Sequence, residues 1–88
     1  MNVQSSTHAV GANAGGGNTF NVTPVSGYKA IGVVGFQNNR GNATAITACL
    51  VDVGNQTVYT YTRNLTSTAY NDIFEVVRVL YVRTGMVG

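Results

Sequence analysis

The stretch Ile73-Phe74-Glu75-Val76-Val77-Arg78-Val79-Leu80-Tyr81-Val82-Arg83 decides the fold of this chain. Alternate residues of a strand face opposite sides, and here both sides are apolar with one embedded charge each, Glu75 and Arg78. A strand with one side in water would instead alternate apolar and polar residues. A chain of 88 residues holds little material to cover both sides. The stretch therefore predicts a β protein in which other copies of the chain cover part of this strand.

Four more segments have the composition of strands, and none shows the 3.6-residue periodicity of a helix. The five predicted strands are residues 19–23, 28–37, 44–53, 56–64 and 73–83. Gly54-Asn55 fits a two-residue type II′ turn with glycine first, which predicts a hairpin. This turn sets the opposed pairs Val53–Gln56, Val51–Val58, Cys49–Thr60, Thr47–Thr62, Leu50–Tyr59, Ala48–Tyr61 and Ile46–Arg63. The sequence predicts an all-β fold, a small antiparallel β-sandwich that is jelly-roll-like, with about five main strands.

Residues 1–18 differ from the rest of the chain because Gly11-Ala12-Asn13-Ala14-Gly15-Gly16-Gly17-Asn18 has no bulky side chain. Such a segment cannot hold a fold by itself. We expect residues 1–18 to form an extended glycine-rich arm that packs on a neighbouring subunit, with a flexible leader as the alternative. Residues 19–88 then form a single β-sandwich domain.

The composition argues against catalysis and against stabilisation by disulfides or metal ions. Only 9% of the residues are charged, and the net charge of +2 is too small to favour nucleic acid. Cys49 is the only cysteine, so no disulfide forms within one chain, and a thiol in mid-strand acts as a small apolar filler. His8 is the only histidine and the three carboxylates are scattered, so we expect no metal site, no cofactor and no enzyme activity. Self-association remains as the route to stability.

The chain starts without a basic or apolar leader, and its longest apolar segment, residues 30–36, is far too short to span a bilayer. We therefore expect a soluble protein made in the host cytoplasm, with no signal peptide and no membrane insertion.

Two groups of residues are candidates for binding. Tyr59, Tyr61 and Arg63 project from one face of a strand, where they could stack on sugar rings or bases. The alternative is that these tyrosines fill the core or a subunit interface. The second group is the predicted oligomer interface of Ile73, Phe74, Val76, Arg78, Leu80 and Val82. Within it we expect Arg78 to need a partner, either Asp52, Asp72 or a residue or carbonyl group of another chain.

Three stretches resemble a known family. Residues 26–36 (Ser-Gly-Tyr-Lys-Ala-Ile-Gly-Val-Val-Gly-Phe), the strand 58–64 and the strand 77–83 are similar to a terminal domain of bacteriophage and prophage fibre proteins. The resemblance covers about residues 26–83. It implies a β-sandwich, usually trimeric, at the tip of a tail or head fibre, where it contacts host-surface glycans or proteins. This chain departs from the pattern because only the short glycine-rich arm, and no stalk, precedes the domain.

These observations predict a viral structural protein of the virion, a homotrimer in a fibre or appendage that attaches to the host surface. One alternative is a capsid or tail decoration protein, a cement subunit whose residues 1–18 lock onto other virion proteins. A third is a cytoplasmic nucleic-acid-binding β domain that uses Tyr59, Tyr61 and Arg63.

Overall fold

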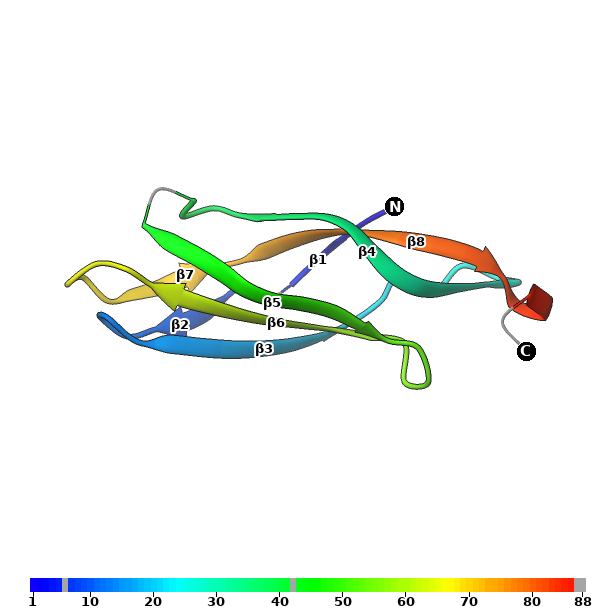
Figure 1. The fold of residues 1–88 in the computed structure, drawn as a ribbon, viewed down its shortest axis with the longest axis horizontal. Helices are drawn as coiled ribbons and strands as arrows, with labels where there is room; N and C mark the ends of the chain where they lie inside the picture. Colours follow the sequence, from blue (N-terminus) through cyan, green and yellow to red (C-terminus); the bar gives the residue numbers. More distant parts are fainter. Residues whose placement is uncertain (6, 42, 87–88) are drawn as a thin grey trace.

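The computed structural model describes residues 1–5, 7–41 and 43–86, which form an elongated antiparallel β-sandwich measuring 48 × 17 × 16 Å (Figure 1). The predicted all-β class is confirmed, with eight strands rather than five over the described residues. The elements are β1 (Asn2–Gln4), β2 (His8–Val10), β3 (Gly15–Asn21), β4 (Tyr28–Asn38), β5 (Thr44–Asp52), β6 (Thr57–Asn64), β7 (Tyr70–Ile73), β8 (Glu75–Arg83) and a 3-10 turn, η1 (Thr84–Met86). No helix in the described ranges is long and apolar enough to cross a membrane.

The strands pair in a nested order, β1 with β8, β2 with β7 and β3 with β6. The two layers are the sheets β1-β8-β4 and β3-β6-β5, and the ribbon β2-β7 joins them at one end. The predicted last strand is divided at Phe74 into β7 and β8. This division lets one stretch of sequence contribute to both the ribbon and a main sheet.

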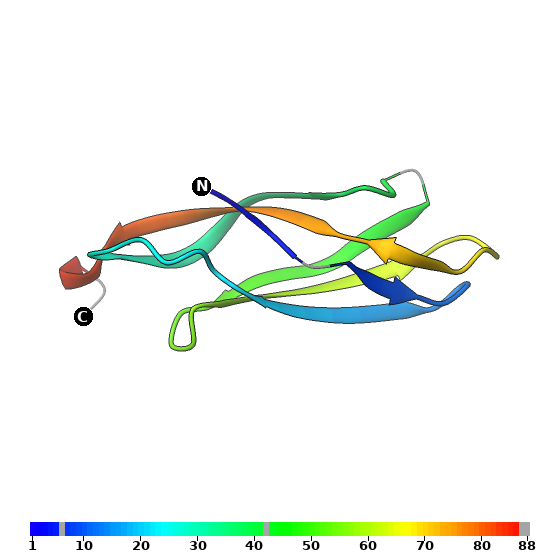
Figure 2. The same ribbon diagram turned by 180° about the vertical axis from the view of Figure 1, so that it is seen from behind.

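The expectation of an extended arm at residues 1–18 is wrong. β1 and β2 run antiparallel to β8 and β7 of the same chain, on the side away from β4 and β5 (Figure 2). The glycine-rich run continues into β3, which pairs along its whole length with β6. Val3 and Val10 are buried, so these residues complete the sandwich instead of leaving it.

The glycines of β3 leave room for tyrosine rings from β6. A Cβ atom on Gly15 would collide with the ring and hydroxyl of Tyr61, and one on Gly17 would lie 2.9 Å from the hydroxyl of Tyr59. Both rings therefore reach over backbone that carries no side chain. This covering explains why a sequence without bulky residues forms a regular strand.

The hairpin of β5 and β6 has the predicted pairing next to its turn. The turn itself differs from the prediction. Val51–Val58, Cys49–Thr60, Leu50–Tyr59 and Ala48–Tyr61 are opposed as expected. A bulge between Ile46 and Ala48 then places Ile46 opposite Thr62 and Ala45 opposite Arg63, so the predicted pairs Thr47–Thr62 and Ile46–Arg63 are wrong. The predicted pair Val53–Gln56 is also wrong, because both residues lie in the turn. The turn is longer than two residues, since the strands end at Asp52 and start at Thr57, and its positive φ is at Gln56 (54°) and not at Gly54.

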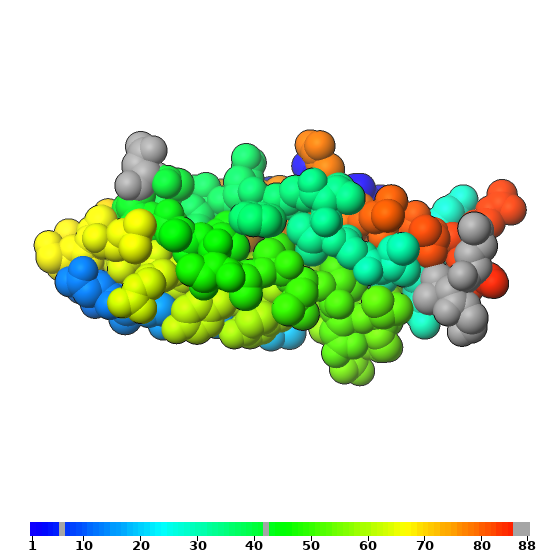
Figure 3. Space-filling view, viewed as in Figure 1, coloured from blue at the N-terminus to red at the C-terminus, as the bar shows by residue number. Residues whose placement is uncertain are grey.

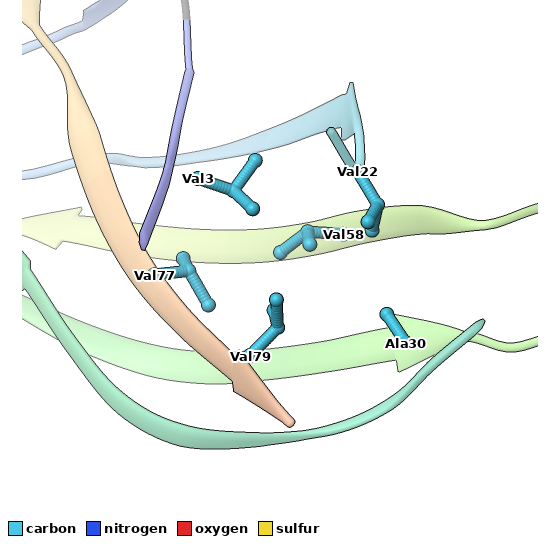
Figure 4. Close-up of a cluster of buried hydrophobic side chains, with 6 residues drawn as sticks. All are labelled: Val3, Val22, Ala30, Val58, Val77 and Val79. Atoms are coloured by element: carbon cyan, nitrogen blue, oxygen red, sulfur yellow. The ribbon is translucent and has the colours of Figure 1, made fainter. Parts of the chain in front are cut away.

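The hydrophobic core is small and built mainly of valines from both sheets (Figure 4). Its buried members are Val3, Val22, Ala30, Val58, Val77 and Val79. Phe20, Cys49 and Tyr81 pack against this cluster from its rim, which agrees with the expected role of Cys49 as a filler. Burial of one valine side chain stabilises by about 1.5–3 kcal/mol, so six small residues supply a modest total.

Gly15→Ala should destabilise the fold by about 2 kcal/mol, because the new methyl group forces the Tyr61 ring off β3. Urea denaturation of the variant measures this loss. Gly32→Ala is the matched control, since a Cβ atom on this strand glycine would meet nothing within 4 Å. Equal losses in the two variants would contradict a role for the Tyr61 ring.

Candidate functional site

Glu75 stands at the start of β8 with its side chain fully buried between the two sheets. A buried carboxylate is costly unless hydrogen bonds replace its water. The His8 ring supplies the shortest of these contacts, with Nε2 2.6 Å from Oε1 of Glu75, and the His8 side chain is only 15% exposed. The histidine and the carboxylate, 67 positions apart in sequence, form one hydrogen-bonded site.

Three further side chains complete the site from three other segments. Ser5 Oγ donates to Oε2 of Glu75 at 2.9 Å, and Thr62 Oγ1 donates to Oε1 at 2.9 Å. Asn18 Nδ2 makes a longer contact of 3.4 Å with Oε2. Ser5 Oγ also accepts a hydrogen bond of 2.8 Å from the backbone N–H of Glu75, so this hydroxyl both donates and accepts. Both carboxylate oxygens are therefore occupied by donors.

These donors control the ionisation of the site. Burial alone would raise the pKa of Glu75, but the hydrogen bonds from His8, Ser5 and Thr62, together with the attraction to His8, hold its pKa below the ordinary value. The neighbouring Cys49 has its pKa raised to about 11 by burial and by the negative charge of Glu75. At neutral pH the site therefore holds a carboxylate beside a protonated thiol.

The arrangement differs from a hydrolytic triad, in which a hydroxyl gives its proton to the histidine. Here the hydroxyls of Ser5 and Thr62 donate to Glu75. Three hollows of about 200–250 Å³ on the described part of the chain are lined by residues other than Glu75 and His8. The described ranges also contain no group of three residues that could hold a metal ion. The hydrogen bonds of the site connect β8 with the N-terminal segment and with β6.

Sequence reasoning missed this cluster. It recognised Glu75 as a lone charge on an apolar strand face and His8 as an isolated histidine, but it did not join them. The signal was present, because a single acid on a buried face and a single histidine in the chain each need a partner.

The predicted tyrosine stripe lies on the surface. Tyr59, Tyr61 and Arg63 share the outer face of β6, whereas Val58, Thr60, Thr62 and Asn64 of the same strand point inward and are buried. Tyr59 is 36% exposed, and Leu50 beside it is 51% exposed. Arg63 contacts only the carbonyl oxygen of Asn13, at 3.5 Å, among the hydrogen bonds of the described residues. The alternative that these tyrosines fill the core is wrong.

The residues of the predicted oligomer interface differ in their exposure. Ile73 is fully buried within its own chain, so its assignment to an interface is wrong. Leu80 and Arg78 face outward from β8 and are exposed, and Phe74, Val76 and Val82 are half-buried. Leu80 lies beside Gly32 of β4, and that strand also exposes Val34 and Phe36 at 59% and 52%.

Arg78 has no carboxylate partner among the described residues, and its Nε lies 3.5 Å from Oδ1 of Asn2. The expectation that Asp52 or Asp72 pairs with it is wrong within one chain. Asp72 instead binds Arg40, whose guanidinium also lies 4.6 Å from the centre of the Tyr70 ring. Asp52 accepts hydrogen bonds from Asn55 in the turn before β6. A contact of Arg78 with another chain stays a prediction.

A shallow hollow of about 250 Å³ lies next to Arg78 on the outer side of the β1-β8-β4 sheet. It forms where Gly35 has no side chain, and Asn2, Phe36, Gln37 and Val76 line the rest of it. Polar and apolar groups thus meet on a face that the chain itself leaves uncovered.

Comparison with known proteins finds no match to this chain among protein-family models, curated proteins or solved structures. The resemblance to fibre domains therefore stays a prediction based on the residues that carry it.

Glu75→Gln should lower the free energy of unfolding by about 3 kcal/mol at neutral pH, since an amide replaces a buried carboxylate that accepts hydrogen bonds from four side chains. The contribution should also depend on pH. Because the native pKa of Glu75 is depressed, its stabilisation is complete above the ordinary glutamate value of about 4.3 and is lost as the pH falls through the native pKa.

Urea denaturation from neutral to acid pH tests both effects. The gap between the native chain and Glu75→Gln should close as the pH falls. Asp72→Asn serves as the control, because this half-exposed acid pairs with Arg40 at the surface and should change stability little. A gap that stays constant down to the acid transition would contradict the assigned role of the Glu75 charge.

Proposed function

We propose that the chain is a structural subunit of a virus fibre or appendage, assembled from several copies, that takes part in attachment to the host surface. The observation that carries this proposal is the exposure of three large apolar side chains on β8 and β4. Leu80 faces outward from β8, Val34 lies at the bulge of β4, and Phe36 lies opposite Val77 at the free edge of the sheet. Leu80 is 47% exposed, and Val34 and Phe36 are more than half exposed. Large apolar side chains exposed on neighbouring strands are typical of protein interfaces.

The strands next to this surface support assembly through their composition. β4 and β5 lie beside each other on one side of the molecule (Figure 3). Between Ala30 and Val51 the sequence carries a single charged residue, Arg40. Natural edge strands that must stay apart usually carry charges or proline. Long strands without charges favour contact with another protein surface, and we propose a second and third copy of this chain.

The tyrosine stripe supports the attachment part of the proposal. Tyr59 and Tyr61 lie on the other layer from Leu80, so assembly through β8 and β4 leaves them accessible. Aromatic rings beside an exposed arginine are suited to sugar rings that carry negative groups. The alternative of a decoration protein anchored by residues 1–18 has less support, because strands of the same chain already bind this segment.

Solution mass tests the assembly. Light scattering should give three times the 9.2 kDa of one chain. Leu80→Lys should reduce the mass to that of one chain, because the interface would have to bury an unpaired charge. Leu65→Lys is the matched control, since Leu65 is 60% exposed in the connection after β6, away from this surface, and should leave the mass unchanged. A native chain that is monomeric at all concentrations would refute the proposal.

A printed glycan array tests the attachment. The native assembly should bind a subset of glycans, and the double variant Tyr59→Ala, Tyr61→Ala should lose that binding. Circular dichroism and solution mass should show that the double variant keeps its fold and assembly. Tyr28→Ala is the control, because Tyr28 is 44% exposed on β4, in the other layer. Equal loss in the control would contradict a binding role for the stripe.

A further inference from the structure

One long side of the sandwich is open between the edge strands β4 and β5, which lie beside each other (Figure 3). Phe36 is the Cα partner of Val77, and Ile46 is that of Thr62. Both partners are fully buried, so Phe36 and Ile46 point to the inner faces of their sheets. Phe36 is nevertheless 52% exposed, and the two side chains line a hollow of about 200 Å³. The interior is therefore uncovered along this side.

The backbone of both edges is available for pairing. Within the described part of the chain, residues 31–37 and 45–51 make backbone hydrogen bonds only to β8 and to β6. The edge of β4 is closed at its start, where the Gln56 carboxamide accepts from the N–H of Ala30 and donates to its carbonyl oxygen, both at 2.9 Å. Neither free segment carries a charge. Free, uncharged edges are suited to the addition of a strand.

We propose that the free edge of β4 in one copy pairs with the free edge of β5 in the next copy, around a three-fold axis parallel to the long axis of the molecule. The pairing rests on the proposed assembly of three copies and specifies which strands meet. Each copy offers one edge of each kind, so the contact is heterologous and closes into a ring. β4 and β5 run in opposite directions, and rotation about this axis preserves that relation, so the new pair is antiparallel (Figure 1).

The contacts within one chain also give the register of this pairing. Rotation about the long axis keeps every residue at its height along the molecule. Asn38 and Thr44 are at one height, because Nδ2 of Asn38 donates to Oγ1 of Thr44 at 2.9 Å. From there each strand contains one bulge, between Val33 and Gly35 in β4 and between Ile46 and Ala48 in β5, so the two strands stay in step. Gly32 is therefore at the height of Leu50.

This register brings two exposed leucines together. Leu80 is the Cα partner of Gly32 on the outer face of its sheet, and Leu50 faces outward beside Tyr59. Their exposed fractions are 47% and 51%. Gly32 places no side chain between them, so Leu80 of one copy meets Leu50 of the partner subunit above the glycine. Contact between them removes apolar surface from water on both copies.

The inner faces contribute to the same contact. Three open sides face the axis, so the Phe36 side chains of the three copies gather around it and cover one another. The residue that is half exposed in one chain thereby becomes part of a shared core. The tyrosine stripe stays accessible, because it lies on the outer face of β6.

Cysteine cross-linking tests the register. Directly opposed Cα atoms of an antiparallel pair lie about 4.5–5.5 Å apart, which suits a disulfide. A chain with Gly32→Cys, Leu50→Cys and Cys49→Ser should form covalent species of two and three chains on oxidation. Within one chain these two positions face outward from different layers. Leu65→Cys in place of Leu50→Cys is the matched control and should leave single chains.

The outcomes separate the pairing from the assembly. A native chain with the mass of one chain would refute the assembly and the pairing together. A native mass of three chains without the cross-link between positions 32 and 50 would overturn the pairing alone. Covalent pairs formed by Gly32→Cys alone, in the Cys49→Ser chain, would also overturn it, because like edges would then meet.

Hydrogen exchange of the native assembly gives a readout that needs no cysteine. Peptides that cover residues 31–37 and 45–51 should exchange more slowly in the native assembly than in Leu80→Lys, since paired edge amides are protected. An assembly of three copies whose two edges exchange as fast as in the single chain would overturn the pairing, whatever the cysteine variants do.

Discussion

The buried carboxylate of Glu75 is the constraint on which the arrangement of the strands depends. A charge in the interior is tolerated only when donors surround it, and the donors here come from segments that are distant in sequence from Glu75. Ser5 and His8 require the N-terminal segment to lie against β7 and β8, and Thr62 requires β6 to cross the same point from the opposite sheet. The nested pairing of the strands satisfies all of these contacts together.

Features that depend on alternation could be predicted from the sequence. The two faces of β6 are as expected, because a strand has a fixed period of two and its composition differs between the faces. The opposed pairs nearest the turn, such as Val51–Val58, follow from the centre of the turn at Gly54-Asn55, which was predicted although the length of the turn was not. Beyond Ala48 the prediction fails, since a bulge adds one residue and shifts every later pair. The alternation carries no signal for such an insertion.

Features that depend on contacts between distant segments could not be predicted in this way. The glycine run suggested an arm because glycine has no side chain of its own to pack, and the Tyr61 ring that covers Gly15 lies on another strand. The site around Glu75 was missed for the same reason, as its partners are spread from Ser5 to Thr62. Local composition describes only the conformations that a segment can adopt by itself. The strand β3 and the site around Glu75 instead depend on side chains that other strands contribute.

The placement of polar and apolar side chains is unusual for a chain that folds as a monomer. Threonine, asparagine and glutamate occupy fully buried positions at one half of the interior, while Leu80 and Phe36 are about half exposed. A chain selected only to fold as a monomer would gain from the reverse placement, because a buried leucine contributes about 1.5–3 kcal/mol and a buried polar group must first be satisfied. The exposed positions of the larger apolar side chains fit the proposal that they contact another copy of the chain. The hydrogen bonds of the polar interior are directional, so they favour one geometry more strongly than the valine core does by itself.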